Sequence, residues 1–462
     1  MSIKDKMWQK QSLDKYLAKD NQFIKSMNAF DLMALGIGAV IGTGIFILPG
    51  TVAALKAGPG IMLSFVIAAI VCSLAAMCYA EFSSAMPIAG SAYSYGNVIF
   101  GEFIGWILGW ALILEYMLAV AAVSTGFSAY FSSLLQGFGL AIPKVLSGPF
   151  DPVHGTYINI VAVIIVWLIT WLLSQGMKQS VRINNIMVIV KISIIVIFLL
   201  VGVFYVKPAN WHPFLPFGKL GVLHGASTVF FAYLGFDAVS SSAAEVKNPQ
   251  RNMPIGIIGT LVIATVLYIL VSVVLTGMVS FRELDVANPV AFALQKVGQN
   301  WTAGIISLGA LAGMFTMMVT MIYSSSRLIY SIGRDGLLPK FLGRLQGKNH
   351  LPQHSLLLAT LIISFLGGLV PLDQLTSLVN IGTLIAFTFV SIGIIPLRKH
   401  TEITHTGFHV PWSPVLPIIS ALACIGLMLT LSLETWIASL IWFAIGMVIY
   451  FTYGIHHENI SD

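Results

Sequence analysis

The stretch Gly36–Phe46 has residues suited to binding a ligand through the main chain. It carries four glycines within an apolar run long enough to cross a bilayer: Gly36, Gly38, Gly42 and Gly44. Glycine destabilises a helix because it loses more backbone entropy than other residues, so we expect this helix to break. Freed main-chain groups are tolerated in a membrane only where protein buries them or a ligand or water reaches them. The stretch predicts a main-chain binding site, or alternatively only close helix packing.

A second stretch, Phe230–Asp237, places Gly235 after several aromatic residues and just before an acid. It predicts another break at the corresponding position of a second half of the chain. Paired breaks of this kind are the best sequence indication of the central site of a secondary transporter. A half-helix N-terminus offers N–H groups and a positive dipole to a carboxylate, while C-terminal carbonyls accept from an ammonium group. Two facing breaks would therefore suit a zwitterion such as an α-amino acid.

Three charged residues, Glu115, Lys191 and Asp237, lie inside apolar runs. Charges within a membrane are expensive and usually functional. Lys191 lies about nine residues, roughly 13 Å of helix, from the inner end of its span, which is too far for snorkelling. Since burial favours the neutral amine, we interpret Lys191 as the proton-coupling residue. Glu115 could pair with a cationic substrate, hold water, carry a proton or be structural, and Asp237 could brace the second half-helix or bind directly.

The composition indicates a membrane protein. Hydrophobic residues make up 57% of the chain and charged residues only 9%, with a mean hydropathy of +0.90, which excludes ordinary soluble domains. Long uncharged runs recur, whereas a transmembrane barrel would show short alternating segments. The three cysteines have no metal-ligand or disulfide spacing, and the glycine-rich stretch has no phosphate-loop lysine. We therefore expect an all-α polytopic membrane protein with no metal and no enzymatic activity.

Twelve membrane spans are expected from the apolar runs. Their approximate limits are 30–55, 61–85, 100–131, 158–176, 181–206, 219–243, 254–278, 300–327, 355–371, 374–397, 414–431 and 434–454. With the N-terminus inside, 17 of the 24 lysine and arginine residues fall on the inner side, which predicts cytosolic termini. The first 27 residues have no apolar core and resemble a cytosolic tail. The net charge of +6 is explained by anionic lipid and requires no nucleic-acid partner.

Four motifs in order resemble the amino acid–polyamine–organocation superfamily, most closely its bacterial branch related to cationic amino acid transporters. They are Gly36–Phe46, Phe230–Asp237, Glu245–Pro254 and Gly333–Gly336, and the resemblance covers essentially the whole chain. It implies a LeuT-type fold, with two inverted five-helix repeats and two additional C-terminal helices. The implied divisions are a tail at 1–27, repeats at 28–206 and 219–397, two helices within 414–454 and a tail at 455–462.

The resemblance also implies positions for the substrate. Its carboxylate would meet main-chain N–H groups around Thr43 and Gly44, and its amine would meet carbonyls of both breaks. The implied binding residues are Val40, Ile41, Gly42, Thr43, Gly44, Phe231, Ala232 and Leu234. In the family, a lysine at the position of Lys191 replaces a sodium ion. Met321 is expected in the side-chain pocket with Glu115, although a buried acid favours cationic substrates and a bulky methionine opposes them.

We therefore expect a secondary transporter that takes up neutral, alanine-like amino acids with protons by alternating access across the plasma membrane. Amino acid exchange and transport of arginine or lysine are the alternatives, and a receptor that binds without transporting is a distant one. The proton is the only coupling ion expected, with no other cofactor. The expected partners are the substrate and the lipid bilayer, and whether a small accessory membrane subunit binds is left open.

Overall fold

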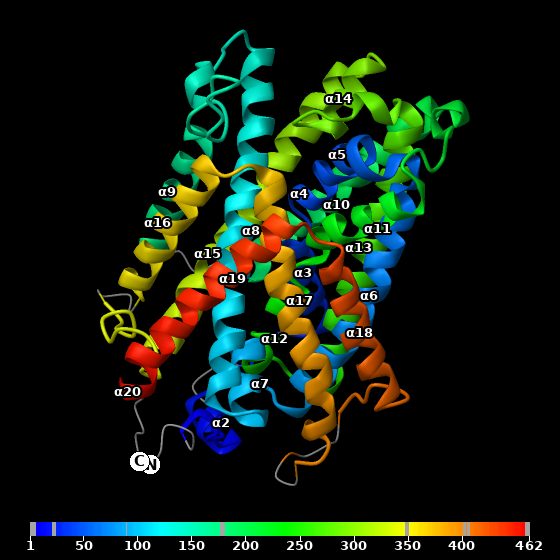
Figure 1. Cartoon of the computed structure of the whole chain (residues 1–462). Coiled ribbons are helices and arrows are strands. Elements are labelled where there is room, and N and C mark those ends of the chain that lie inside the picture. The colour runs from blue at the N-terminus through cyan, green and yellow to red at the C-terminus, as the bar shows by residue number, and fades with distance from the viewer. Residues whose placement is uncertain are drawn as a thin grey trace.

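The computed structural model describes residues 6–20, 25–88, 90–175, 181–346, 351–400, 403 and 407–457. Parts of the two predicted tails, at 1–5, 21–24 and 458–462, lie outside the described residues. Figure 1 shows a bundle of long helices that run between two ends of the molecule. The predicted helical class is confirmed for the part of the chain that the structure describes.

Long apolar helices dominate the described chain. Eight helical stretches are long and apolar enough to cross a membrane, and four apolar helices are shorter. The long stretches contain α6 (Ile61–Ala85), α8 (Glu102–Gly137), α10 (Val181–Gly202), α11 (Gly218–Val229) with α12 (Phe236–Ser240), α13 (Pro249–Met278), α15 (Asn300–Arg334), α17 (Leu372–Leu397) and α19 (Leu433–Ile449). The shorter helices are α3 (Ala29–Val40), α9 (Ile160–Ser174), α16 (Gln353–Leu369) and α18 (Val415–Leu429). The number and hydropathy of these helices are those of a polytopic membrane protein.

Helix α8 lies in the middle of the bundle and packs against α15, α16 and α17 (Figure 1). Helix α13 packs against α6 and α3, and α10 packs against α3 and α15. The first broken segment therefore lies between two groups of long helices. This packing removes its main-chain groups from lipid, as irregular backbone in a membrane requires.

Helix α15 is longer than predicted. We expect a span that ends near residue 327 and is followed by a charged loop, but the helix continues to Arg334. The Ser325 hydroxyl donates to the carbonyl of Met321 at 2.8 Å, so this polar side chain is satisfied within the helix. The Arg327 guanidinium lies 4.8 Å from the centre of the Tyr323 ring, one turn earlier. Such local contacts stabilise the added turns without requiring an apolar sequence.

The N-terminal segment, predicted to be a tail, is partly ordered against the bundle. It contains α2 (Leu13–Asp20), and the Tyr16 hydroxyl accepts a hydrogen bond from Asn97 of α7 (Ser91–Ile99) at 3.1 Å. The Lys6 ammonium donates to the carbonyl of Ile455 at 3.1 Å. The two ends of the described chain therefore meet at one end of the bundle.

A buried ion pair ties α6 to the chain that follows α17. The Glu81 carboxylate, 1% exposed, accepts two hydrogen bonds from the Arg398 guanidinium at 2.7 and 2.8 Å. It also accepts from the main-chain N–H of Val410 at 2.6 Å. Glu81 thus joins two segments far apart in sequence through a bidentate pair, whose geometry is specific to arginine and a carboxylate.

Candidate functional site

The first predicted break is present. Helix α3 ends at Val40, Ile41 is extended with φ −80° and ψ 100°, and α4 (Thr43–Phe46) begins after Gly42. Gly42 adopts φ −141° and ψ −133° and has no side chain to cap α4. The first N–H groups of a helix have no partner within that helix. The break therefore presents carbonyls on one side and N–H groups on the other.

The second predicted break is present as well. Helix α11 ends at Val229, a 3₁₀ turn (η6) covers Phe230–Tyr233, and Leu234 is extended. Helix α12 follows Gly235, whose φ of +110° lies in the left-handed region that favours glycine. An added Cβ at this glycine would lie 3.0 Å from the Ala39 carbonyl carbon. The glycine therefore permits both the turn and the close approach of the two broken segments.

The two breaks lie against each other. An added Cβ on Gly44 would lie only 2.6 Å from the Cα of Ala232. The Tyr268 hydroxyl of α13 lies 2.6 Å from the Ala232 carbonyl oxygen and 3.1 Å from that of Val40, so it can donate to either. Thr43 is fully buried, and its hydroxyl has no hydrogen-bond partner among the described residues.

The predicted substrate-binding residues thus come together from two distant segments. All of them are buried: Val40, Ile41, Gly42, Thr43, Gly44, Phe231, Ala232 and Leu234. They surround main-chain donors and acceptors shut away from solvent, where hydrogen bonds are strong and unpaired groups are unfavourable. The arrangement can bind a small molecule that carries both an acceptor and a donor. Their individual roles in binding stay predictions.

Lys191 of α10 reaches the first break. Its ammonium group donates to the carbonyl of Gly38 at 2.9 Å and to that of Ile41 at 3.2 Å. The residue is 1% exposed, and its aliphatic stem passes Gly313 of α15, where an added Cβ would lie 3.3 Å from Cε. A cation at the C-terminal end of α3 is favourable because the helix carbonyls point there. The ammonium group thus contacts the carbonyl end of the first break, and the role of Lys191 in proton coupling stays a prediction.

Glu115 and Asp237 form one buried acidic cluster. Asp237 lies in the first turn of α12 and accepts a hydrogen bond from the Tyr116 hydroxyl at 3.2 Å. Glu115 of α8 is 1% exposed and interacts electrostatically with Asp237. Among the described residues, the hydroxyl of Thr383 on α17 is a polar side-chain group beside the Glu115 carboxylate. The proposed functions of both acids stay predictions, but a change in the charge of one acts on the other.

The predicted pocket residue Met321 is buried on α15, one turn after Met317 on the same helix face. Met317 is the methionine placed at the break, since an added Cβ on Gly42 would lie 2.5 Å from its sulfur. Nothing in the sequence separates the candidates in this helix, which are Met314, Phe315, Met317, Met318 and Met321. Met317 therefore joins Met321 as a candidate for contact with the substrate side chain.

Two residues at the site were not predicted from the sequence. Tyr268 bridges the breaks, and Asn380 of α17 donates to the carbonyls of Ser227 at 2.6 Å and Thr228 at 3.4 Å, near the end of α11. Each is a polar side chain inside an apolar span. That pattern is a usable signal, because such groups in a membrane usually bond to another helix.

The sequence matches the amino acid permease family over residues 27–453. The methylthioribose transporter of Bacillus subtilis is 50% identical over 445 residues, which cover 96% of each chain. The branched-chain amino acid permease BcaP of the same species is 45% identical over all of both chains. Cationic amino acid transporter 4 of Homo sapiens is 34% identical over 81% of this chain and 60% of its own. The paired helix breaks and these matches together show that the chain belongs to the amino acid permease family, within the amino acid–polyamine–organocation superfamily.

Proposed function

We propose that this permease takes up neutral amino acids together with protons across the plasma membrane by alternating access. The observation that carries the proposal is the Lys191 ammonium bonded to the Gly38 and Ile41 carbonyls of the first break. Amino acid transport itself follows from the family and from close relatives named as permeases. Proton coupling and the choice of substrate are the steps beyond that.

The proposed architecture has twelve spans in two inverted five-helix repeats, residues 28–206 and 219–397, with two further helices in 414–454. It is supported by helix breaks in the first predicted span of each repeat. The hydrogen bond between Lys6 and Ile455 favours an even number of spans, because it brings both chain ends to one face. The lysine and arginine distribution favours the cytosol as that face.

In the proposed mechanism, the substrate carboxylate binds N–H groups at the start of α4. Its amine binds carbonyls of the breaks near Phe231 and Leu234, while Tyr268 donates to those of Val40 and Ala232. Protonated Lys191 holds the carbonyl end of α3 in the arrangement described. Once Lys191 loses its proton, it can no longer donate as an ammonium, and the break is released toward another arrangement. Substrate and proton then shift the equilibrium between access states because each binds one state better than the other.

A neutral substrate is favoured by the surroundings of the breaks. Phe231 lies in the second break and Met317 lies beside Gly42 of the first, and both side chains are apolar. The buried acids Glu115 and Asp237 are the feature that would favour the cationic alternative. The relatives differ in what they are named for: branched-chain amino acids, cationic amino acids and methylthioribose. Methylthioribose is the second candidate substrate because the relative named for it is 50% identical to this chain.

The test is uptake of radiolabelled alanine, leucine, arginine and methylthioribose into proteoliposomes, with and without an inward proton gradient. We expect accumulation of a neutral amino acid that follows the gradient and is lost in Lys191→Met. Lys207→Met, which removes an exposed lysine, is the matched control and should transport normally. Full gradient-driven uptake by Lys191→Met would refute the coupling role.

The same assay distinguishes symport from exchange and one substrate class from another. Uptake that ignores the gradient and requires internal amino acid would identify an exchanger. Accumulation of arginine alone would identify a cationic amino acid transporter, and accumulation of methylthioribose alone would replace the substrate class. Binding without flux would identify a receptor.

A further inference from the structure

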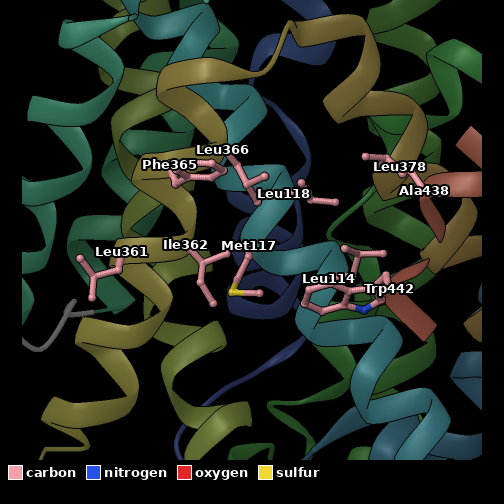
Figure 2. A pocket seen from close by; sticks show the side chains of 10 residues that line it. All are labelled: Leu114, Met117, Leu118, Leu361, Ile362, Phe365, Leu366, Leu378, Ala438 and Trp442. Carbon is pink, nitrogen blue, oxygen red and sulfur yellow. The ribbon is translucent and has the colours of Figure 1, made fainter. Parts of the chain in front are cut away.

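An apolar cavity of about 390 Å³ lies between α8, α16, α17 and α19, away from the two helix breaks. Figure 2 shows Met117 of α8 facing the cavity opposite Ile362 of α16. The α8 wall is formed by Leu114, Met117 and Leu118. Leu378 of α17 and Ala438 and Trp442 of α19 line the other side.

The walls offer almost no polar partner. Every lining side chain is a hydrocarbon or a thioether except that of Trp442. Its indole N–H already donates to the carbonyl of Trp110 at 3.2 Å. Water needs two to four polar partners to occupy a buried site, and an amino acid needs partners for two charges. The cavity therefore excludes the permease substrate and favours a hydrocarbon ligand.

The cavity is continuous with the surface that faces lipid. Two of its rim residues on α16, Leu361 and Phe365, are 56% and 64% exposed. On α19, the neighbouring Leu440 is 62% exposed. Met117 and Trp442 each lie near the middle of their spanning helices, so the cavity lies near the bilayer midplane. At that depth the surrounding solvent is acyl chain, about 15 Å from either headgroup layer.

We propose that this cavity binds one acyl chain of a membrane phospholipid. An apolar cavity of about 150 Å³ is enough to hold benzene, so 390 Å³ holds a longer hydrocarbon segment. An empty cavity would deprive its lining atoms of dispersion contacts. A flexible chain that enters from the adjoining lipid restores those contacts without burying a polar group.

The test uses a phospholipid that carries a photoreactive diazirine near the middle of one acyl chain, in proteoliposomes of phosphatidylethanolamine and phosphatidylglycerol. After irradiation, labelled residues are mapped by proteolysis and mass spectrometry. We expect adducts on Met117 and Leu118, which are each 1% exposed and so cannot be reached by lipid outside the cavity. Wild-type protein labelled at exposed Leu440 but not at these two residues would overturn the proposal.

Two matched variants sharpen the result. Ala438→Phe places a ring in the cavity and should abolish the adducts on Met117 and Leu118. Ala444→Phe makes the same change at a lipid-exposed position of α19 that does not line the cavity, and should leave them unchanged. Equal labelling in both variants would overturn the proposal. Labelling of the two residues by a photoreactive sterol but not by the phospholipid would do so too.

Discussion

The Tyr268 hydroxyl joins the two breaks, and removing it tests whether they must lie together, an arrangement called closed below, for substrate to bind. Tyr268→Phe removes one oxygen and changes little else in a fully buried ring. It leaves the Ala232 and Val40 carbonyls without this donor at 2.6 and 3.1 Å. In an open state, water can hydrate the same carbonyls, so the loss falls mainly on the closed state.

The expected magnitude follows from the penalty for an unsatisfied buried carbonyl, about 1–3 kcal/mol. If substrate binding requires the breaks to close, this penalty appears as weaker apparent affinity, about 5-fold to 150-fold in Kd. Equilibrium binding of radiolabelled substrate to purified protein measures it directly. Uptake at saturating substrate should fall less than uptake at low substrate.

Tyr130→Phe is the matched control. The Tyr130 hydroxyl is also buried and donates to a single carbonyl, that of Phe46, at 2.8 Å. Both variants should lose comparable thermal stability, but only Tyr268→Phe should lose affinity strongly. Unchanged affinity in Tyr268→Phe, or an equal loss in both variants, would refute the idea that this hydroxyl joins the two breaks.

Three further variants test other contacts. Gly44→Ala adds a methyl group 2.6 Å from the Cα of Ala232, and the overpacking, about 1–3 kcal/mol, should weaken substrate binding. Gly426→Ala adds a methyl group that meets nothing within 4 Å and should leave substrate binding normal. Glu81→Gln leaves the Arg398 guanidinium without its carboxylate partner and should lower the melting temperature in detergent. The loss in free energy of unfolding should be at most about 3 kcal/mol, since that guanidinium is partly exposed. Adding Arg398→Gln should restore part of the loss, and strictly additive effects would contradict the pairing. Met317→Ala opens space beside Gly42 and should raise the uptake of leucine relative to alanine by about tenfold. An unchanged ratio would exclude contact between Met317 and the substrate side chain.

The positions of both breaks could be predicted because they depend on local backbone physics. Clustered glycines within an apolar run disfavour a continuous helix at Ile41–Gly42, where the structure has the first break. The second break, at Leu234–Gly235, has a single glycine and is indicated by its corresponding position in the second half. The lysine at 191 could also be singled out, because an unpaired charge in a membrane requires a partner. Its partners, the Gly38 and Ile41 carbonyls, became identifiable only with the fold.

The sequence does not determine the contacts between spans. Nothing in the local pattern distinguishes Met317 from Met321, because the choice depends on how α15 is rotated against the first break. The proximity of Glu115 to Asp237 likewise depends on how α8 faces α12. The order in α2 required tertiary packing as well, since Tyr16 is buried only by helices far from it in sequence.

The bond between Lys6 and Ile455 also has a consequence for biosynthesis. The two residues are 449 positions apart, so the ribosome must complete nearly the whole chain before Lys6 can meet its partner. The first segment to be made is therefore among the last to dock fully. A chain released before residue 455 would lack this contact. Other contacts of the same segment, such as that of Tyr16 with Asn97, join residues close in the order of synthesis and can form much earlier. The segment is thus held in two steps that are well separated in time.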